Sequence, residues 1–115
     1  MNYYIVIPAH NEEAFMALTL QSLADQTVLP TKAVIVNDNS TDKTGDIVLA
    51  FAEKHPWISL VNATSDAIHL PGSKVILAFQ KGLETLDDQY DIMVKADADL
   101  IFPPNYFETI INHFQ

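Results

Sequence analysis

The chain has 115 residues, a formal net charge of −9 at pH 7 and a hydrophobic fraction of 49%, which suits one globular domain with a single core. Its six basic residues argue against nucleic acid or an anionic membrane surface as a partner. The absence of cysteine excludes disulfides and thiolate metal sites, and residues 1–6 lack the basic stretch of a signal peptide, so we expect a cytoplasmic protein.

The first apolar, β-branched run predicts a strand at residues 4–7. We expect Pro8 to end this strand, because proline cannot donate to a sheet ladder. Asn11 is then expected to cap a helix, with Glu12 and Glu13 in its first turn. The apolar stripe of that helix is Met16, Leu20 and Leu23.

A second strand is predicted at residues 33–36, followed by a cluster of turn and capping residues at 37–42. The helix that starts there is expected to end at His55, because the residue before Pro56 is disfavoured in helical geometry. Its stripe is predicted as Ile47, Phe51 and Lys54, with Ala50 alongside.

The rest of the chain repeats the alternation. A strand at 58–61 leads into an irregular loop at 62–72 and then a third helix, and a strand at 92–94 precedes a helix opened by residues 103–105. The third helix has the clearest periodicity, carried by Val75, Phe79, Gly82, Leu83 and Leu86. The last helix carries Ile110, Ile111 and Phe114, which we expect to be exposed.

The order β-α-β-α-β-α-β-α predicts an α/β fold, a Rossmann-like mostly parallel sheet with helices on both faces. Ligands of such sheets bind at the carboxyl ends of the strands. We therefore expect residues 8–12, 37–40, 62–72 and 97–99 to lie along one edge.

Two carboxylates, Asp97 and Asp99, follow the last strand and are one residue apart. Carboxylate oxygens suit Mg²⁺ or Mn²⁺, and such a cation neutralises the charge of a nucleotide diphosphate. The alternative is a solvated acidic turn. A second polar cluster on the same edge favours a site for a cation and phosphates.

Three blocks, at residues 5–13, 34–42 and 94–99, resemble the family 2 glycosyltransferases with the GT-A fold. The resemblance implies that residues 1–115 form a single nucleotide-diphospho-sugar-binding GT-A domain, truncated at the C-terminus. It also implies a UDP-sugar as donor and Mn²⁺ or Mg²⁺ as cofactor.

The resemblance assigns roles to the acidic residues. Asp38 would accept a hydrogen bond from the ring N–H of the base, with a turn or N-cap aspartate as the alternative. Asn37 stands where the family usually has a further aspartate, which leaves the base open. Asp99 would bind the metal directly, and Asp97 would contact the ribose or support the metal through water.

The remaining assignments concern the nucleotide pocket. Pro8, Ala9 and Asn11 would border the base and His10 would stack on it, unless His10 is a surface or capping residue. Glu12 would shape the pocket or act only as a first-turn charge. Lys74 would reach the base or diphosphate from a helix start or lie in solvent, whereas Lys95 would pair with a neighbouring carboxylate.

We therefore expect a glycosyltransferase acting on a glycan or lipid-linked acceptor in the full protein, with membrane attachment left open. Residues 1–115 contain no candidate catalytic base, so this part should bind donor without transferring sugar. Its exposed sheet edge and last helix predict self-association as a homodimer. The alternatives are a sugar-nucleotide nucleotidyltransferase, which the glycine-free residues 8–11 disfavour, and a non-catalytic metal- or nucleotide-binding module.

Overall fold

A computed structural model describes residues 1–63 and 73–114, with the backbone alone for residues 73–77. Strands and helices alternate along the chain. They are β1 (Tyr3–Ala9), α1 (Glu13–Ala24), β2 (Lys32–Asp38), α2 (Thr44–Lys54), β3 (Ile58–Ala63), α3 (Ser73–Glu84), β4 (Ile92–Lys95) and α4 (Tyr106–Phe114). In the part of the chain that is described, no helix has the length and apolar character needed to cross a membrane.

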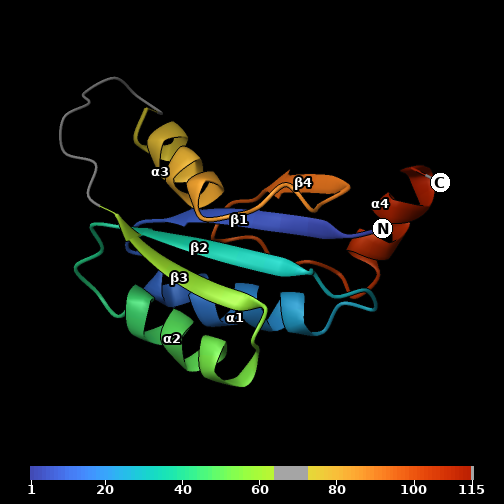
Figure 1. The fold of residues 1–115 in the computed structure, drawn as a ribbon. Coiled ribbons are helices and arrows are strands. Elements are labelled where there is room, and N and C mark those ends of the chain that lie inside the picture. Colours follow the sequence, from blue (N-terminus) through green and yellow to red (C-terminus); the bar gives the residue numbers. More distant parts are fainter. Residues whose placement is uncertain (64–72, 115) are drawn as a thin grey trace.

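The four strands form one parallel sheet in the order β3-β2-β1-β4. Helices α1 and α2 cover one face and α3 covers the other (Figure 1). The predicted α/β fold with helices on both faces is therefore confirmed. The carboxyl ends of β1, β2 and β3 meet at the left-hand edge of Figure 1, which is where the topology predicts a ligand.

Strand alternation divides the core between the two faces of the sheet. In β1, Ile5 and Ile7 join the core cluster on the α1 and α2 side, whereas Val6 joins the cluster on the α3 side with Val34 and Val36. All five side chains are buried. Continuous apolar strands are thus explained by burial on both faces.

Strand β1 continues one residue beyond Pro8, so the prediction that Pro8 ends it was wrong. In a parallel strand, successive residues bond to opposite neighbours. Tyr3 accepts a hydrogen bond from Thr31 on the β2 side, and Val6 accepts one from Ala96 on the β4 side. The missing N–H of Pro8 therefore faces the β4 side, where the β4 ladder has already ended at its pairing with Val6.

The predicted apolar stripe of α2 needs a correction. The buried residues of α2 are Thr44 and Val48, with Ile47 and Phe51 partly buried beside them, whereas Ala50 and Lys54 are exposed. The stripe was therefore placed partly on the wrong side of the helix. The α3 stripe is better predicted, because Phe79, Gly82, Leu83 and Leu86 face the second core cluster; the side chain of Val75 lies outside the described residues.

Helix α4 packs against the amino end of β1. Phe107 is buried and stacks on Tyr3 with ring centroids 4.8 Å apart. Ile111 is also buried and Ile110 is partly buried, so the expected exposure of these two isoleucines was wrong. Phe114 alone of the predicted trio is exposed, at 62%.

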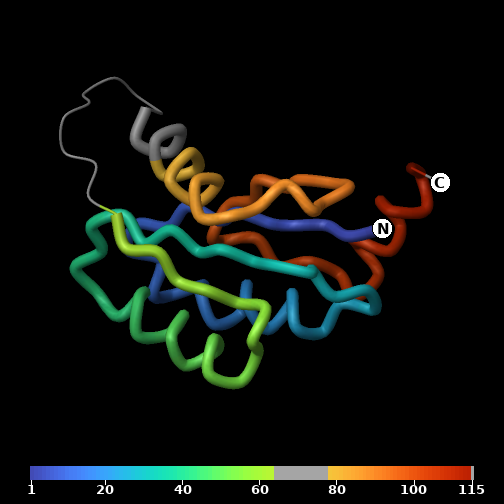
Figure 2. The backbone as a smooth tube through the Cα atoms, viewed as in Figure 1, coloured from blue at the N-terminus to red at the C-terminus, as the bar shows by residue number. Residues whose placement is uncertain are grey.

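The segment between β4 and α4 runs along α1, to which buried polar side chains attach it. Figure 2 shows this orange-to-red segment passing from β4 to the α1 side of the sheet. Thr19 donates to the carbonyl of Ala98, Ser22 accepts from the N–H of Phe102, and Gln26 accepts from the N–H of Phe107. Thr19 and Ser22 on α1, together with Gln26 just beyond its end, therefore support the whole segment.

At the opposite edge of the sheet, Asp87 joins the starts of β1 and β2. Its carboxylate accepts a hydrogen bond from the Tyr4 hydroxyl and forms an ion pair of 2.9 Å with Lys32. These bonds, together with the N–H of Gln89, lower the pKa of Asp87 to about 2. Asp87 therefore attaches the loop between α3 and β4 to the sheet.

We expect Asp87→Asn to lower the free energy of unfolding at neutral pH and to make no difference in strong acid. A depressed native pKa contributes stability above the unfolded value near 3.8 and loses it as the pH falls through about 2. Urea unfolding of both proteins at several pH values measures the difference. A difference that persists unchanged below pH 2 would contradict the assignment.

Candidate functional site

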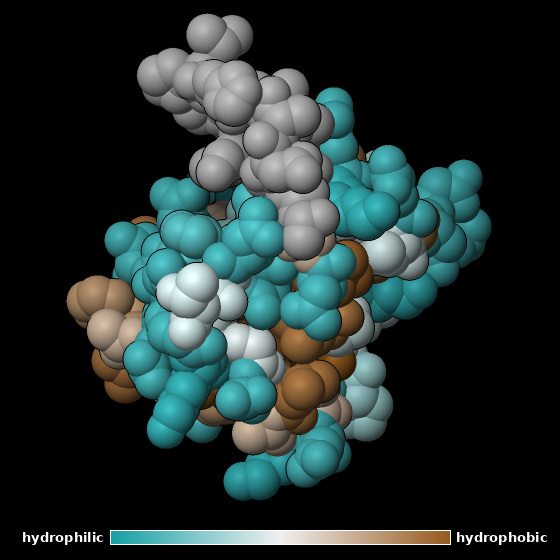
Figure 3. All heavy atoms as spheres, turned by 90° about the vertical axis from the view of Figure 1, so that its left-hand side faces the viewer, coloured by the Kyte–Doolittle hydropathy of each residue, from teal (hydrophilic) through white to brown (hydrophobic). Residues whose placement is uncertain are grey.

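A pocket of about 440 Å³ lies at the carboxyl ends of β1 and β2, beside the turn that follows β4. This volume falls within the range of small-molecule sites. Its lining consists of Pro8, Ala9, His10, Glu12, Asp38, Asn39, Ala78, Asp97, Ala98 and Asp99. In the view onto this edge, hydrophilic side chains dominate the surface and a strip of hydrophobic ones runs among them (Figure 3).

The structure brings seven of the predicted site residues to this pocket and leaves Asn11 outside its lining. The pocket residues that were predicted are Pro8, Ala9, His10, Glu12, Asp38, Asp97 and Asp99. Asn11 does not line the pocket, and the side chain of Lys74 lies outside the described residues. The sequence reasoning placed Asn39 and Ala98 at this edge without assigning them to the pocket, and it missed Ala78. Ala78 lies four residues before Gly82 on the predicted α3 stripe, a signal that could have placed it.

Residues 96–100, which follow β4, form a turn that we call the acidic turn. It presents the carboxylates of Asp97 and Asp99 to the pocket because buried and exposed residues alternate there. Ala96 and Ala98 are buried, at 5% and 3% exposure, whereas Asp97 and Asp99 between and after them are exposed. A hydrogen bond of 3.3 Å from the N–H of Leu100 to the carbonyl of Asp97 closes the turn. The two small residues allow the turn to lie close against the core while the aspartates face outward.

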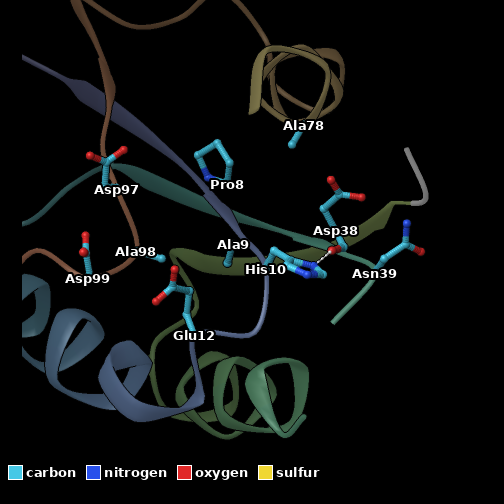
Figure 4. A pocket seen from close by; sticks show the side chains of 10 residues that line it. All are labelled: Pro8, Ala9, His10, Glu12, Asp38, Asn39, Ala78, Asp97, Ala98 and Asp99. Atoms are coloured by element: carbon cyan, nitrogen blue, oxygen red, sulfur yellow. Dashed lines mark hydrogen bonds between the residues drawn. The ribbon is translucent and has the colours of Figure 1, made fainter. Parts of the chain in front are cut away.

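Glu12 supplies a third carboxylate near this end of the pocket. Figure 4 shows its side chain directed toward Asp99 and Ala98. Partial burial, followed by the negative charges of Asp99 and Asp42, raises the pKa of the Glu12 carboxyl. This end of the pocket is therefore strongly negative.

The donor set fits Mg²⁺ or Mn²⁺. Both cations prefer carboxylate oxygen, and Mg²⁺ is commonly bound by one or two carboxylates together with substrate phosphates. Asp97 and Asp99 match that number. Within residues 1–63 and 73–114, no group of three or more histidine, aspartate or glutamate side chains is arranged to enclose a metal. Two carboxylates leave the other coordination positions of such a cation to water or phosphate oxygens.

The other end of the pocket is formed by His10, Asp38 and Asn39, with Pro8 and Ala9 between the two ends (Figure 4). Nδ1 of His10 lies 2.7 Å from the backbone carbonyl oxygen of Asp38. Since a carbonyl only accepts, Nδ1 carries the proton in this bond. The bond holds the imidazole ring against the end of β2.

The prediction that Asn11 caps α1 was wrong. That position belongs to Glu12, which makes no capping bond with its side chain. Asn11 has a positive φ of 53° and its side-chain oxygen accepts a hydrogen bond of 2.7 Å from the N–H of Thr41. Its side chain is therefore used to join the loops that follow β1 and β2, and asparagine tolerates this backbone conformation.

Asp38 is not the N-cap of α2, so of its two alternative roles only that of a turn aspartate remains. Asp38 is the last residue of β2, and Asp42 holds the start of α2 by accepting bonds from the N–H and hydroxyl of Thr44. Asn37 faces the other side of the sheet, where its amide nitrogen donates to Asn62. Asn37 does not line the pocket, so its difference from the family pattern lies away from Asp38.

The two ends of the pocket differ in the chemistry they offer. One end has a carboxylate acceptor and an imidazole ring, which suit a planar nitrogenous base. The other has outward-facing carboxylates, which suit a cation carrying phosphate. A nucleotide diphosphate has both groups in one molecule.

Comparisons with known proteins agree with this geometry. A family model for glycosyl transferase family 2 matches residues 4–115. The Bacillus subtilis (strain 168) protein named "Probable glycosyltransferase YdaM" is 42% identical over 59 residues, which cover 50% of this chain and 14% of that protein.

Solved structures share the fold. The structure of S. aureus TarS 1–349 in complex with UDP has a TM-score of 0.73 and 22% identity, covering 97% of this chain and 31% of that one. The mannosyltransferase PcManGT from Pyrobaculum calidifontis, in complex with GDP-Man and Mn²⁺, has a TM-score of 0.67 and 25% identity, covering 89% and 28%. Because the family model extends over nearly the whole chain, this protein belongs to glycosyl transferase family 2.

Proposed function

We propose that the pocket binds a nucleotide-diphosphate sugar, with a UDP-sugar as the donor, together with Mn²⁺ or Mg²⁺, for transfer of the sugar to an acceptor hydroxyl. One observation carries this proposal. Asp97 and Asp99 lie at one end of a single pocket and Asp38 with His10 lies at the other (Figure 4). Membership of glycosyl transferase family 2 supports the reaction class.

Each residue has a role that follows from its place. Asp99 and Asp97 would hold the cation, with Asp99 as the direct ligand. When bound, the cation neutralises charge on the diphosphate as the nucleotide leaves. Asp38 accepts a hydrogen bond from the base, and the His10 ring, held by the Asp38 carbonyl, stacks on it. Pro8 and Ala9 form the apolar floor between the two ends.

The acceptor character of Asp38 favours a base with a ring N–H over adenine. Uracil carries a ring N–H that can donate a hydrogen bond to a carboxylate, whereas the adenine of a nucleotide has no ring N–H. Guanine also carries such a group, and PcManGT is a complex with GDP-Man, whereas the TarS structure contains UDP. The proposal of UDP for this chain therefore needs a direct comparison of nucleotides.

We expect UDP to bind more tightly than ADP in the presence of Mn²⁺, and Asp38→Ala to reduce that preference. Loss of a partly buried hydrogen bond to a charged group costs about 1–3 kcal/mol, which is about a 5- to 150-fold rise in the UDP dissociation constant. Isothermal titration calorimetry with UDP, GDP and ADP measures the preference. Asp88→Ala, which removes the same charge far from the pocket, is the control.

Two results would contradict the proposal. Equal losses for UDP and ADP on Asp38→Ala would remove the role of Asp38 in recognising the base. Absence of UDP binding by the wild-type chain with either cation would remove the nucleotide site itself.

We also propose that residues 1–115 act as one donor-binding unit. The chain spans 14% of YdaM and about a third of the TarS chain. In this proposal the contacts to the acceptor, and the catalytic base, come from protein corresponding to the unmatched parts of those relatives. Donor binding, measured directly, is therefore the property of this chain that tests the site.

A further inference from the structure

Thr19, on the buried side of α1, contacts the backbone of the acidic turn. Its hydroxyl donates a hydrogen bond of 2.8 Å to the carbonyl oxygen of Ala98. The residue is fully buried, and Ala98 is the residue between Asp97 and Asp99. Thr19 itself does not line the pocket. It therefore reaches the acidic turn from the core side, opposite the carboxylates.

The other bonds to this turn leave its centre to Thr19. The N–H of Ala96 donates to Val6, which fixes the start of the turn to β1, and the Leu100 bond lies within the turn itself. The ion pair between Lys95 and Asp97 is 3.9 Å long and exposed, so it adds little. Within residues 1–63 and 73–114, the Thr19 hydroxyl thus links the middle of the turn to a helix.

We infer that Thr19 is a positioning residue for the acidic turn: its hydroxyl fixes the Ala98 carbonyl and thereby the direction in which Asp97 and Asp99 face the pocket. This inference rests on the proposed function for the role of the two aspartates. The buried methyl group of Ala98 keeps the turn against the core. The hydroxyl of Thr19 fixes the orientation of the peptide group between Ala98 and Asp99. Metal-ligand geometry tolerates little displacement, so supporting contacts of this kind affect affinity strongly.

The helix offers a matched comparison one turn further along. Ser22 is also buried and its hydroxyl accepts a bond of 3.1 Å from the N–H of Phe102. Phe102 lies outside the pocket lining. The Ser22 hydroxyl also donates to the backbone carbonyl of Thr19. Ser22→Ala therefore removes a buried hydroxyl that bonds Phe102 and the Thr19 backbone, while the Thr19 hydroxyl and its bond to Ala98 stay in place.

The test compares Thr19→Val, Thr19→Ser and Ser22→Ala with the wild-type chain. Calorimetry gives the ratio of UDP dissociation constants without and with Mn²⁺, and an NMR titration with uridine gives the affinity of the base end alone. We expect Thr19→Val to reduce the Mn²⁺ ratio about tenfold, in line with effects of residues that support metal ligands. Uridine affinity should stay within twofold. Thr19→Ser, which keeps the hydroxyl, and Ser22→Ala should keep the wild-type ratio.

A second readout needs no ligand and separates this inference from the proposed function. Backbone NMR shifts of residues 96–100 should change in Thr19→Val and stay close to wild type in Thr19→Ser, with His10 and Asp38 unchanged in both. If neither Mn²⁺ nor Mg²⁺ gives the wild-type chain a gain in UDP affinity, the proposed function fails, and these shifts still decide whether Thr19 sets the turn.

Should Thr19→Val not fold, the pair Thr19→Ala and Thr19→Ser replaces it, because the two variants differ only in the hydroxyl. The inference is overturned if folded variants without the hydroxyl keep the wild-type shifts of residues 96–100. It is also overturned if the wild type shows a Mn²⁺ gain that these variants keep in full. An equal loss of uridine affinity and Mn²⁺ gain would indicate a purely structural role and would overturn it as well.

Discussion

Asp99→Asn should remove most of the UDP affinity that Mn²⁺ provides. The substitution keeps the shape of the side chain and removes the charged oxygen that would bind the cation. If the lost contact is worth as much as a hydrogen bond to a charged group, about 2 kcal/mol, the dissociation constant rises roughly 30-fold. Calorimetry with UDP at saturating Mn²⁺ and in the presence of a chelator measures the two affinities.

The neighbouring aspartate gives an internal comparison. Asp97→Asn should weaken binding less, because Asp97 is proposed to contact the ribose or to support the cation through water. Asp88→Asn, an isosteric loss of charge outside the pocket, controls for the change in net charge. A full Mn²⁺ gain in Asp99→Asn would show that another group binds the cation.

Gly82→Leu should cause the largest loss of stability, about 3 kcal/mol in the free energy of unfolding. A Cβ atom at position 82 would lie 2.6 Å from Cγ1 of Val6 and 2.9 Å from Cγ2 of Val36. Both valines belong to the fully buried face of the sheet beneath α3. Forcing extra atoms into a packed core typically costs about 1–3 kcal/mol, and a leucine adds four carbons here.

Urea unfolding monitored by circular dichroism measures this loss. Lys81→Leu introduces the same side chain at an exposed neighbour and should change stability by less than about 0.5 kcal/mol. If Gly82→Leu were as stable as Lys81→Leu, α3 would not pack on Val6 and Val36 as closely as the structure has it. The smaller substitution Gly82→Ala should also lower the free energy of unfolding. Adding Val6→Ala to it should recover part of that loss, because it removes the methyl group that the new Cβ atom meets.

The sequence predicted the sheet, its covered faces and the edge at which ligands bind, because these depend on period and on the order of elements. Local details that depend on tertiary contacts were predicted less well. The side chain of Asn11 could cap a helix or bind a second loop, and only the position of Thr41 decides between them. Pro8 could end a strand or extend it, depending on where β4 stops.

The same reason explains what was missed around the acidic turn. Asp97 and Asp99 were predictable from their position after an apolar strand. Thr19 was not, because a threonine in the middle of a helix gives no sequence signal for a partner 79 residues away. The burial of Ile111 depended in turn on Phe107 and Tyr3 bringing α4 against the start of β1.

The position of β4 has a consequence for how the molecule is made. Strand β1 pairs with β4 through Tyr3 and Ile92, so one side of β1 stays unpaired until residue 92 has been synthesised. Contacts of such long sequence separation form slowly. The acidic turn follows β4 directly, and its first bond is to Val6. A chain stalled before residue 92 can thus have three strands and two of its loops in place but no metal end to its pocket. Cation-dependent nucleotide binding should therefore appear only after β4 has emerged, and it would report that β4 has paired with β1.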